Sequence, residues 1–355
     1  IAGTHGKTTT TGMISHCLVA GGLDPTMVVG GSIPALGGSS RVGRGELMVA
    51  EACEYDRSFL NLRPEVAVVT NIEEDHLDYY RDLADIRSAF RAFAGQVPHH
   101  GRILVCAEDP GACETVLGLA AAVESYGIAV EGAHWRALDL DLAGGLPTYT
   151  LARRGERICR VELLVPGRHN VLNSLAAIGA CAAAGLAPEV AARALASFGG
   201  VNRRFQLVSS AGGLAVIDDY AHHPTEIRSV VRAARQRYPH GNVIAIFQPH
   251  QHSRTRHLLG DFAAALAEAD LVVLPDIYFS RDSEAERRAI SAVHLVAELQ
   301  RLGADARHIP QFEAIAAHVG AVAREGDVVI TMGAGDVWKV AHLIAAGKAS
   351  VGAAA

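Results

Sequence analysis

Short apolar runs alternate with longer amphipathic stretches along most of this 355-residue chain. Short runs of this kind, rich in Val and Ile, predict strands that are buried on both faces of a parallel sheet. In the first half, the runs that predict strands are 26–29, 47–50, 66–70 and 103–106. The stretches that predict helices are 9–20, 83–96, 170–184 and 188–197. Residues 135–165 change to a rough alternation of apolar and polar positions, which predicts an antiparallel hairpin extending the sheet.

The second half repeats the same alternation of strands and helices. Its predicted strands are 215–218, 243–247, 271–275, 308–309 and 328–332, and its predicted helices are 225–236, 254–268, 289–302, 312–324 and 337–346. Gly199 and Gly200 interrupt the pattern between the two series, and we expect the domain boundary there, giving domains 1–199 and 200–355. The fold class predicted for both is α/β, with mostly parallel sheets covered by helices on both faces.

Composition narrows the classes of function. A formal net charge of -6 and a pI near 6.3 argue against nucleic acid or an anionic membrane as the main partner. No apolar run approaches the roughly 18 residues that cross a bilayer. The six cysteines form no C-x-x-C pair, and most lie in apolar segments, which predicts buried free thiols in a reducing cytoplasm.

A phosphate-binding loop is predicted at Gly3-Thr4-His5-Gly6-Lys7-Thr8, followed by Thr9. Glycines allow the tight turn that aims backbone N–H groups at a triphosphate, the lysine ammonium neutralises phosphate oxygens, and the Thr8 hydroxyl can bind Mg²⁺. The next helix adds its positive N-terminal dipole. The alternative is a surface turn. Lysine occurs only three times in the chain, and arginine cannot replace it in such a loop, which favours the phosphate site.

Two further side chains are predicted at the same sheet edge. Glu51 follows one predicted strand and His76 lies beyond the next, and the carboxyl ends of parallel strands share one edge. With Thr8, a carboxylate and an imidazole beside a triphosphate suit two divalent-ion positions. Taken singly, Glu51 is equally consistent with a solvated carboxylate, and His76 with an ordinary loop histidine.

Polar clusters follow other elements. Asn170 and Asn173 lie on one face of a predicted helix, where two amides suit the edge of an adenine; helix capping by Asn170 is the alternative. Arg204 lies just beyond the predicted boundary, where an arginine could reach phosphates. Dense polar segments at 218–224 and 247–256 each follow a strand of the second series, and the acidic balance disfavours a nucleic-acid patch there. The glycine turn at 333–336 is as consistent with a structural role as with a functional one.

Together these segments resemble the Mur ligase family, and more narrowly its alanine-adding branch. The segments that carry the resemblance are 3–11, 49–59, 70–78, 166–173, 203–206, 218–224 and 247–255. The resemblance implies a central P-loop ATPase domain at 1–199 and a Rossmann-like domain at 200–355. The family's N-terminal domain, which binds the UDP-sugar, is expected to be absent from this chain, because only Ile1 and Ala2 precede the phosphate loop.

The resemblance also implies a reaction. ATP and Mg²⁺ would activate the lactyl carboxylate of UDP-N-acetylmuramate as an acyl phosphate, and the amine of L-alanine would then displace phosphate, in peptidoglycan precursor synthesis. The alternatives are a recycling ligase that joins a tripeptide to the same sugar nucleotide, and a catalytically silent ATP-binding fragment. By the same resemblance, the loop would hold ATP through Lys7 and Thr8, and the ions through Thr8, Glu51 and His76. Asn170 and Asn173 would contact adenine. Arg204 and Asp219 would contact phosphate and ribose, and His222 and Arg254 would contact alanine.

This sequence departs from the family pattern in two places. Some members carry a modified lysine after the histidine segment, and this chain has no lysine between residues 8 and 338, as in the alanine-adding branch. The family often has Arg after the Pro-His of the segment at 247–255, and here that position is Gln251. Contact with the carboxylate of the amino acid would therefore rest on Arg254 or on His252.

Overall fold

The computed structural model describes the backbone of residues 1–352 and the side chains of residues 1–347. The chain divides into two compact units, Ile1–Asn202 and Arg203–Ala355, and each is described by itself. The division lies a few residues beyond the glycine pair at 199–200.

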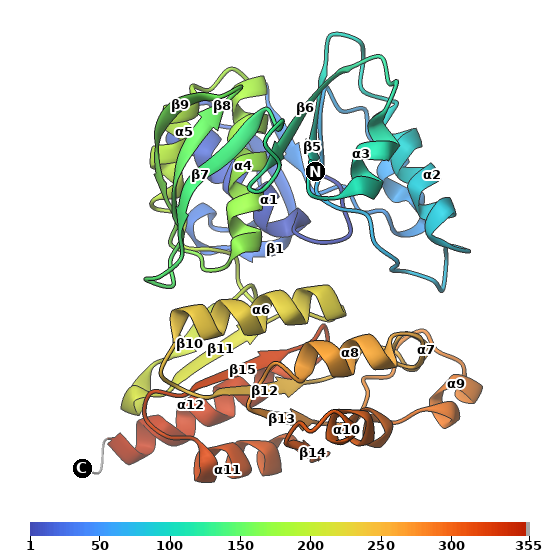
Figure 1. Ribbon diagram of the computed structural model, residues 1–355, viewed down its shortest axis with the longest axis vertical. Helices are drawn as coiled ribbons and strands as arrows, with labels where there is room; N and C mark the ends of the chain where they lie inside the picture. Colours follow the sequence, from blue (N-terminus) through green and yellow to red (C-terminus); the bar gives the residue numbers. More distant parts are fainter. Residues whose placement is uncertain (353–355) are drawn as a thin grey trace. The chain divides into compact units, whose positions relative to one another are not determined.

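The first unit contains two sheets and the helices around them (Figure 1). Its helices are α1 (Lys7–Ala20), α2 (Leu83–Ala94), α3 (Pro110–Val116), α4 (Arg168–Ala183) and α5 (Pro188–Leu195), with a 3-10 segment at Tyr55–Asn61. Its strands are β1 (Thr26–Ile33), β2 (Gly38–Arg41), β3 (Met48–Ala50), β4 (Val66–Val69), β5 (Arg102–Cys106), β6 (Ala122–Gly127), β7 (Trp135–Asp141), β8 (Thr148–Arg153) and β9 (Glu156–Glu162).

The larger sheet has the order β4-β5-β6-β7-β8-β9, and the smaller has the order β2-β1-β3. β4 to β7 run parallel, and β8 and β9 add to them antiparallel, which confirms the predicted hairpin extension. Ile1 and Ala2 lie between the two sheets. The backbone of Ile1 bonds Ala50 and Ala52, and that of Ala2 bonds Val68 and Thr70. The predicted phosphate loop therefore leaves from between β3 and β4.

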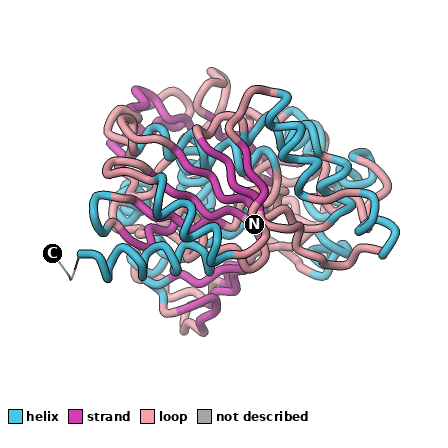
Figure 2. Tube along the Cα trace, turned by 90° about the horizontal axis from the view of Figure 1, so that it is seen from below, coloured by secondary structure: helices cyan, strands magenta, loops and turns pink. Residues whose placement is uncertain are grey.

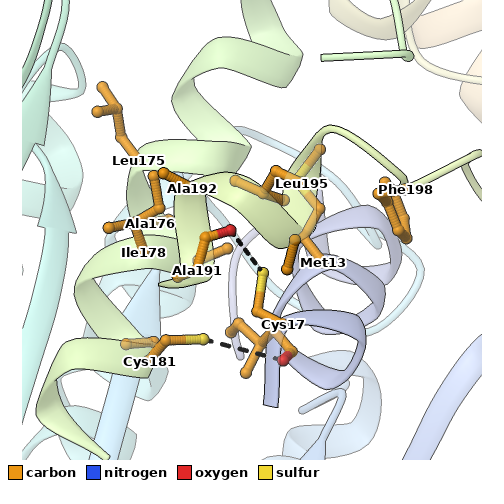
Figure 3. Packing of buried hydrophobic residues seen from close by; sticks show 14 of the residues in the cluster. Met13, Cys17, Leu175, Ala176, Ile178, Cys181, Ala191, Ala192, Leu195 and Phe198 are labelled. Atoms are coloured by element: carbon orange, nitrogen blue, oxygen red, sulfur yellow. Dashed lines mark hydrogen bonds between the residues drawn. The ribbon is translucent and has the colours of Figure 1, made fainter. Parts of the chain in front are cut away.

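Two clusters of buried side chains cover the two faces of the larger sheet. One packs α1, α4 and α5 against the sheet and β1, and the other packs α2 and α3 against β4 and β5. Figure 3 shows the first cluster, where Met13 and Cys17 of α1 meet Cys181 of α4 and Ala191 of α5. The thiol of Cys17 donates to the Ala191 carbonyl at 3.4 Å. The helix that follows the phosphate loop is thus anchored in the core along most of its length.

The second unit contains one six-stranded sheet of order β10-β11-β15-β12-β13-β14. Its strands are β10 (Gln206–Ser209), β11 (Ala215–Asp219), β12 (Val243–Phe247), β13 (Leu271–Leu274), β14 (Ala306–His308) and β15 (Val328–Met332). Its helices are α6 (Pro224–Arg237), α7 (His252–His257), α8 (Leu259–Leu266), α9 (Glu284–Ala289), α10 (Ala292–Arg301), α11 (Phe312–Val322) and α12 (Trp338–Gly352). All pairings are parallel except β10 with β11. Figure 2 shows the strands of the chain in magenta, lying side by side among the helices, which are cyan.

Successive residues of the central strands point to opposite faces of this sheet. Ile217 belongs to a cluster with α6, α8 and α10, whereas its neighbour Val216 belongs to one with α11 and α12 (Figure 1). Both faces are therefore covered, as expected of a parallel sheet. Together with the first unit, this confirms the predicted α/β fold class.

Some predicted elements were wrong in detail. The helix predicted at 254–268 is two helices, α7 and α8, which break at Leu258 (φ -103, ψ 22). The helix predicted at 289–302 begins at Ala292, and Ala289 instead ends the separate helix α9. The Ser291 N–H donates to Nδ1 of His294 at 3.0 Å, and this local bond fixes the start of α10 later than the apolar spacing indicates.

All six cysteines are free, and Cys17, Cys106 and Cys181 are buried as predicted. Cys53 is exposed, so for this residue the prediction of a buried thiol was wrong. Among the residues that the structure describes, no helix combines the length and apolar character needed to cross a membrane.

Candidate functional site

The loop between Ala2 and α1 is fixed by contacts with the residues after β4. The hydroxyl of Thr70 donates to the carbonyl of His5 at 2.6 Å, and the side-chain oxygen of Asn71 accepts from the His5 N–H at 2.8 Å. Gly3 has φ +144, and a Cβ there would lie 1.8 Å from the Thr70 hydroxyl oxygen. Gly6 also has a positive φ, +81, and caps α1. Both glycines are therefore required by the loop's path.

Thr8 and Glu51 meet at the first turn of α1. The hydroxyl of Thr8 donates to Oε1 of Glu51 at 3.1 Å, and Oε2 of Glu51 accepts from the Gly30 N–H at 2.7 Å. The second contact fixes the carboxylate plane, so that Oε1 faces the hydroxyl. Two oxygens at this separation, one of them anionic, fit the hard oxygen ligands that Mg²⁺ prefers. Thr8 and Glu51 therefore lie together as expected, but the expectation of a single sheet edge was wrong, because β3 and β4 belong to different sheets.

Lys7 reaches a carboxylate that the sequence reading did not assign. Its ammonium donates to the carbonyls of Gly3 and Thr4 at 2.5 and 3.1 Å and to Glu54 Oε1 at 2.9 Å. Its distance to Glu54 Oε2 is 2.8 Å, and the Glu54 side chain is only 4% exposed. Burial opposes the charge of Lys7, but the Glu54 carboxylate outweighs it, and the pKa of Lys7 is raised above its usual value. The ammonium is therefore charged at neutral pH.

His76 lies beside the same carboxylate. Its Nε2 is 3.7 Å from Glu54 Oε1 and 3.8 Å from Asp75 Oδ2. Its Nδ1 is buried and makes no hydrogen bond within the described part of the chain. His76 also has φ +56, a conformation uncommon for a residue with a Cβ. A buried ring nitrogen without a partner fits a ligand position for a second ion.

The two asparagines of α4 contact each other at its start. Asn173 Nδ2 donates to Asn170 Oδ1 at 3.0 Å, and Asn170 Nδ2 donates to the Pro166 carbonyl at 2.7 Å. The helix begins at Arg168 with Gly167 as its N-cap, so the alternative of capping by Asn170 was wrong. A Cβ on Gly6 would lie 2.6 Å from Asn173 Oδ1, so this amide lies against the phosphate loop.

In the second unit, Asp219 ends β11 inside the fold. Its oxygens accept from the N–H groups of Phe205 at 2.6 Å and Ala221 at 2.7 Å. Burial raises the pKa of Asp219 to about 6, although Arg204 and these two N–H groups favour the carboxylate. A buried carboxyl that titrates near neutrality is a feature of functional sites as well as of structural networks.

Arg204 and His222 share a glutamate that the sequence reading did not assign. Glu226, in the first turn of α6, lies 3.7 Å from Arg204 Nη1 and 3.3 Å from His222 Nδ1. The guanidinium of Arg204 also lies 5.2 Å from the centre of the Tyr220 ring. The structure thus brings Arg204, Asp219 and His222 to the carboxyl end of β11, next to α6.

Arg254 is a half-buried residue of α7. Gln251 caps that helix with φ +70 and is 2% exposed, and its N–H donates to the Tyr278 carbonyl at 3.1 Å. The ring of His252 lies 3.3 Å from Asp282, which also accepts from the hydroxyl of Ser253 at 2.7 Å. His252 is thus held in place by the Asp282 carboxylate.

The glycine turn after β15 has a clear structural role. Arg203 donates to Asp218 Oδ2 at 3.0 Å and to the Gly333 carbonyl at 2.7 Å, which ties the ends of β11 and β15 together. Gly333 has φ +148, and a Cβ there would lie 2.8 Å from the Gln248 carbonyl oxygen. These contacts account for the turn without a ligand.

The signals for the two unassigned glutamates were weak. Glu54 lies three residues after Glu51, in the segment 49–59 that carries the resemblance. Glu226 is in the first turn of a helix, where an acidic residue is common for dipole reasons alone. Glu54 contacts Lys7, and Glu226 contacts Arg204 and His222. These contacts depend on the path of the backbone between the partners, which the pattern of residues does not specify.

The chain matches two family models over most of its length. The family model "Mur ligase middle domain" matches residues 1–181, and the model "Mur ligase, glutamate ligase domain" matches residues 203–335. The UDP-N-acetylmuramate--L-alanine ligase of Acetivibrio thermocellus is 40% identical over 353 residues, which are 99% of this chain and 74% of that protein. The ligase of the same name from Caldanaerobacter subterraneus is 41% identical over 341 residues, 96% of this chain and 73% of that protein.

A solved structure shows the same architecture. The crystal structure of the UDP-N-acetylmuramate-alanine ligase from Thermotoga maritima matches with a TM-score of 0.81 and 29% identity. The match covers 98% of this chain and 74% of that one.

Proposed function

The chain belongs to the Mur ligase family, and we propose that it is an ATP-dependent ligase that joins L-alanine to the lactyl carboxylate of UDP-N-acetylmuramate. The relatives that carry this activity in their names are about 40% identical over nearly the whole chain. The reaction belongs to the synthesis of peptidoglycan precursors.

The observation that carries the proposal is the pairing at the start of α1. The hydroxyl of Thr8 and the carboxylate of Glu51 lie 3.1 Å apart, immediately beside a charged Lys7 in a glycine loop. Mg²⁺ bound by these two oxygens would neutralise negative charge on the triphosphate as the γ-phosphoryl group is transferred. Lys7 would add a second positive charge, held within the loop that the phosphates would occupy.

The proposed chemistry has two steps. A carboxylate oxygen of the sugar nucleotide attacks the γ-phosphorus, the bond from that phosphorus to the β-phosphate oxygen breaks, and an acyl phosphate and ADP form. The amine of L-alanine then attacks the acyl carbon, loses a proton, and expels inorganic phosphate to leave the amide. The protein's part is to position the groups and to stabilise charge.

The roles of the remaining residues are assigned by the resemblance. Asn170 and Asn173, against the phosphate loop, would contact adenine, and His76 would bind a second ion. Arg204 and Asp219 would contact phosphate and ribose. His222 and Arg254 would contact alanine.

The proposal is tested by measuring the release of ADP by this protein. With Mg·ATP and UDP-N-acetylmuramate present, L-alanine should stimulate the release, and a tripeptide should not. Stimulation by the tripeptide alone would favour the recycling ligase, and stimulation by neither would contradict the proposal. At a Mg²⁺ concentration that is limiting for the wild type, Glu51→Gln should strongly lower the alanine-dependent rate, whereas Glu46→Gln, at an exposed position, should retain it.

A further inference from the structure

All three protons of the Lys7 ammonium have an acceptor in this structure. Two acceptors are carbonyl oxygens of the phosphate loop itself, those of Gly3 and Thr4, and the third is the Glu54 carboxylate. A lysine ammonium has three N–H donors and no more. An oxygen of a nucleotide phosphate can therefore bond to Lys7 only by replacing one of these acceptors.

Glu54 is the acceptor that can be replaced. The two carbonyls belong to a backbone fixed by Thr70 and Asn71, whereas Glu54 reaches Lys7 through a side chain. Its position is nevertheless specific, because the Tyr80 hydroxyl donates to the Glu54 backbone carbonyl at 2.5 Å and the Glu54 side chain is 4% exposed. The carboxylate is thus an anion buried at the place where Lys7 would meet phosphate.

A second partner for Glu54 is already in place. The Nε2 atom of His76 lies 3.7 Å from Glu54 Oε1. A small rotation of the carboxylate would bring it within hydrogen-bond distance of that nitrogen. The acid that gives up Lys7 therefore need not remain without a partner in the buried site.

We propose that Glu54 is a positioning residue that takes the place of phosphate on Lys7 in the nucleotide-free protein, and that Mg·ATP displaces it toward His76. The inference rests on the proposed function, because it assumes that the loop binds ATP. Glu54 keeps the lysine charged and inside the loop before the nucleotide arrives. A nucleotide phosphate must therefore compete with the Glu54 carboxylate for Lys7.

The proposal predicts that removing the charge of Glu54 strengthens the binding of Mg·ATP. Glu54→Gln removes the negative charge but keeps the length and the hydrogen-bonding oxygen of the side chain. The bond between Lys7 and residue 54 becomes weaker, and Mg·ATP should bind at least about tenfold more tightly, the range of one charge-assisted hydrogen bond. A variant that merely disturbed the loop would bind Mg·ATP more weakly.

The experiment is calorimetric titration of Mg·ATP into the wild-type protein and its variants, without the other substrates. Besides Glu54→Gln, the set contains Glu54→Asp, whose shorter side chain also withdraws from Lys7, and Glu46→Gln as an exposed control. Tighter binding by Glu54→Gln, a smaller gain by Glu54→Asp, and no change in Glu46→Gln are expected. If Glu54→Gln does not fold, Glu54→Asp carries the test.

Lys7→Ala and Lys7→Ala/Glu54→Gln complete a double-mutant cycle. If Glu54 acts through Lys7, the second substitution should have little effect on affinity once Lys7 is absent. An equal gain in both backgrounds would mean that Glu54 simply repels phosphate, and would overturn the proposal, as would unchanged or weaker binding by Glu54→Gln. Absence of Mg·ATP binding in every protein, wild type included, would instead overturn the proposed function and this inference with it.

Discussion

The hydroxyl of Thr8 lies 3.1 Å from Oε1 of Glu51, although 43 residues separate them in the chain. The contact exists because α1 begins beside the carboxyl end of β3, and because the Gly30 N–H holds the other oxygen of Glu51. It gives an oxygen pair suited to Mg²⁺ directly beside the lysine of the loop. The following predictions start from this arrangement.

Lys7→Ala should lower the rate of ATP turnover at least about 100-fold, because the γ-phosphoryl transfer would lose a preorganised positive charge. Circular dichroism should show that the fold is retained. The substitution leaves Glu54 buried without its cation, so the double variant Lys7→Ala/Glu54→Gln controls for any loss of stability. Near-normal turnover in either variant would refute the assignment of the loop.

Replacing an ion ligand should raise the Mg²⁺ concentration needed for half-maximal activity. Thr8→Ala, Glu51→Gln and His76→Ala each remove one of few protein ligands. Thr8→Ser keeps a hydroxyl and should keep the wild-type dependence. The ligand assignment fails for any of the three residues whose replacement lowers the melting temperature but leaves the Mg²⁺ dependence unchanged.

Gly3→Ala should destabilise the first unit by roughly 1–3 kcal/mol and weaken nucleotide binding. The new Cβ would lie 1.8 Å from the Thr70 hydroxyl oxygen, on a backbone with φ +144. Gly132→Ala is the matched control, because a Cβ there meets no atom within 4 Å. Denaturant titration of the two variants measures the difference, and equal midpoints would show that the loop can relax around the added methyl group.

Asp219 should make folding stability depend on pH. Its pKa is about 6 in the folded protein against an ordinary value of 3.8, so between these values the folded state binds more protons than the unfolded state. The contribution of Asp219 to the free energy of unfolding should therefore fall by roughly 3 kcal/mol in total as the pH rises from about 4 to about 6, and level off above that range.

The check is the slope of the unfolding free energy against pH in Asp219→Asn. The amide cannot serve both the Phe205 and Ala221 N–H groups, so the variant loses stability at every pH. The difference in unfolding free energy between the wild type and the variant should shrink as the pH rises from 4 to 6, because only the wild type loses the contribution of Asp219. Asp336→Asn, at a half-exposed position, should keep the wild-type slope. Parallel profiles for Asp219→Asn and the wild type would show that another group titrates.

Much of the fold could be predicted because several of its central strands are short, buried and mostly apolar. The strands at Val243–Phe247 and Val328–Met332 have the predicted bounds, since every residue in them is buried and the residues on either side have no regular structure. Helix boundaries were less predictable. Apolar spacing continues through Leu258, where the backbone breaks the helix, and local bonds rather than periodicity decide such points.

The site could be predicted in part. Thr8 and Glu51 were expected together because parallel strands bring their carboxyl ends to one edge. Glu54 was not, because its contact with Lys7 depends on the path of the 3-10 segment that follows it and on the Tyr80 hydroxyl. The mutual bonding of Asn170 and Asn173 likewise depends on side-chain rotation, which spacing along a helix leaves open.

The central claim is that ATP activates the carboxylate of the sugar nucleotide as an acyl phosphate. The most direct measurement uses UDP-N-acetylmuramate labelled with ¹⁸O in its lactyl carboxylate, with Mg·ATP and L-alanine, and follows the label by mass spectrometry. Because the attacking oxygen stays with phosphorus when the amine displaces phosphate, one ¹⁸O should appear in inorganic phosphate, with ADP as the other product. Amide formation with unlabelled phosphate, or with AMP and pyrophosphate in place of ADP, would contradict the mechanism.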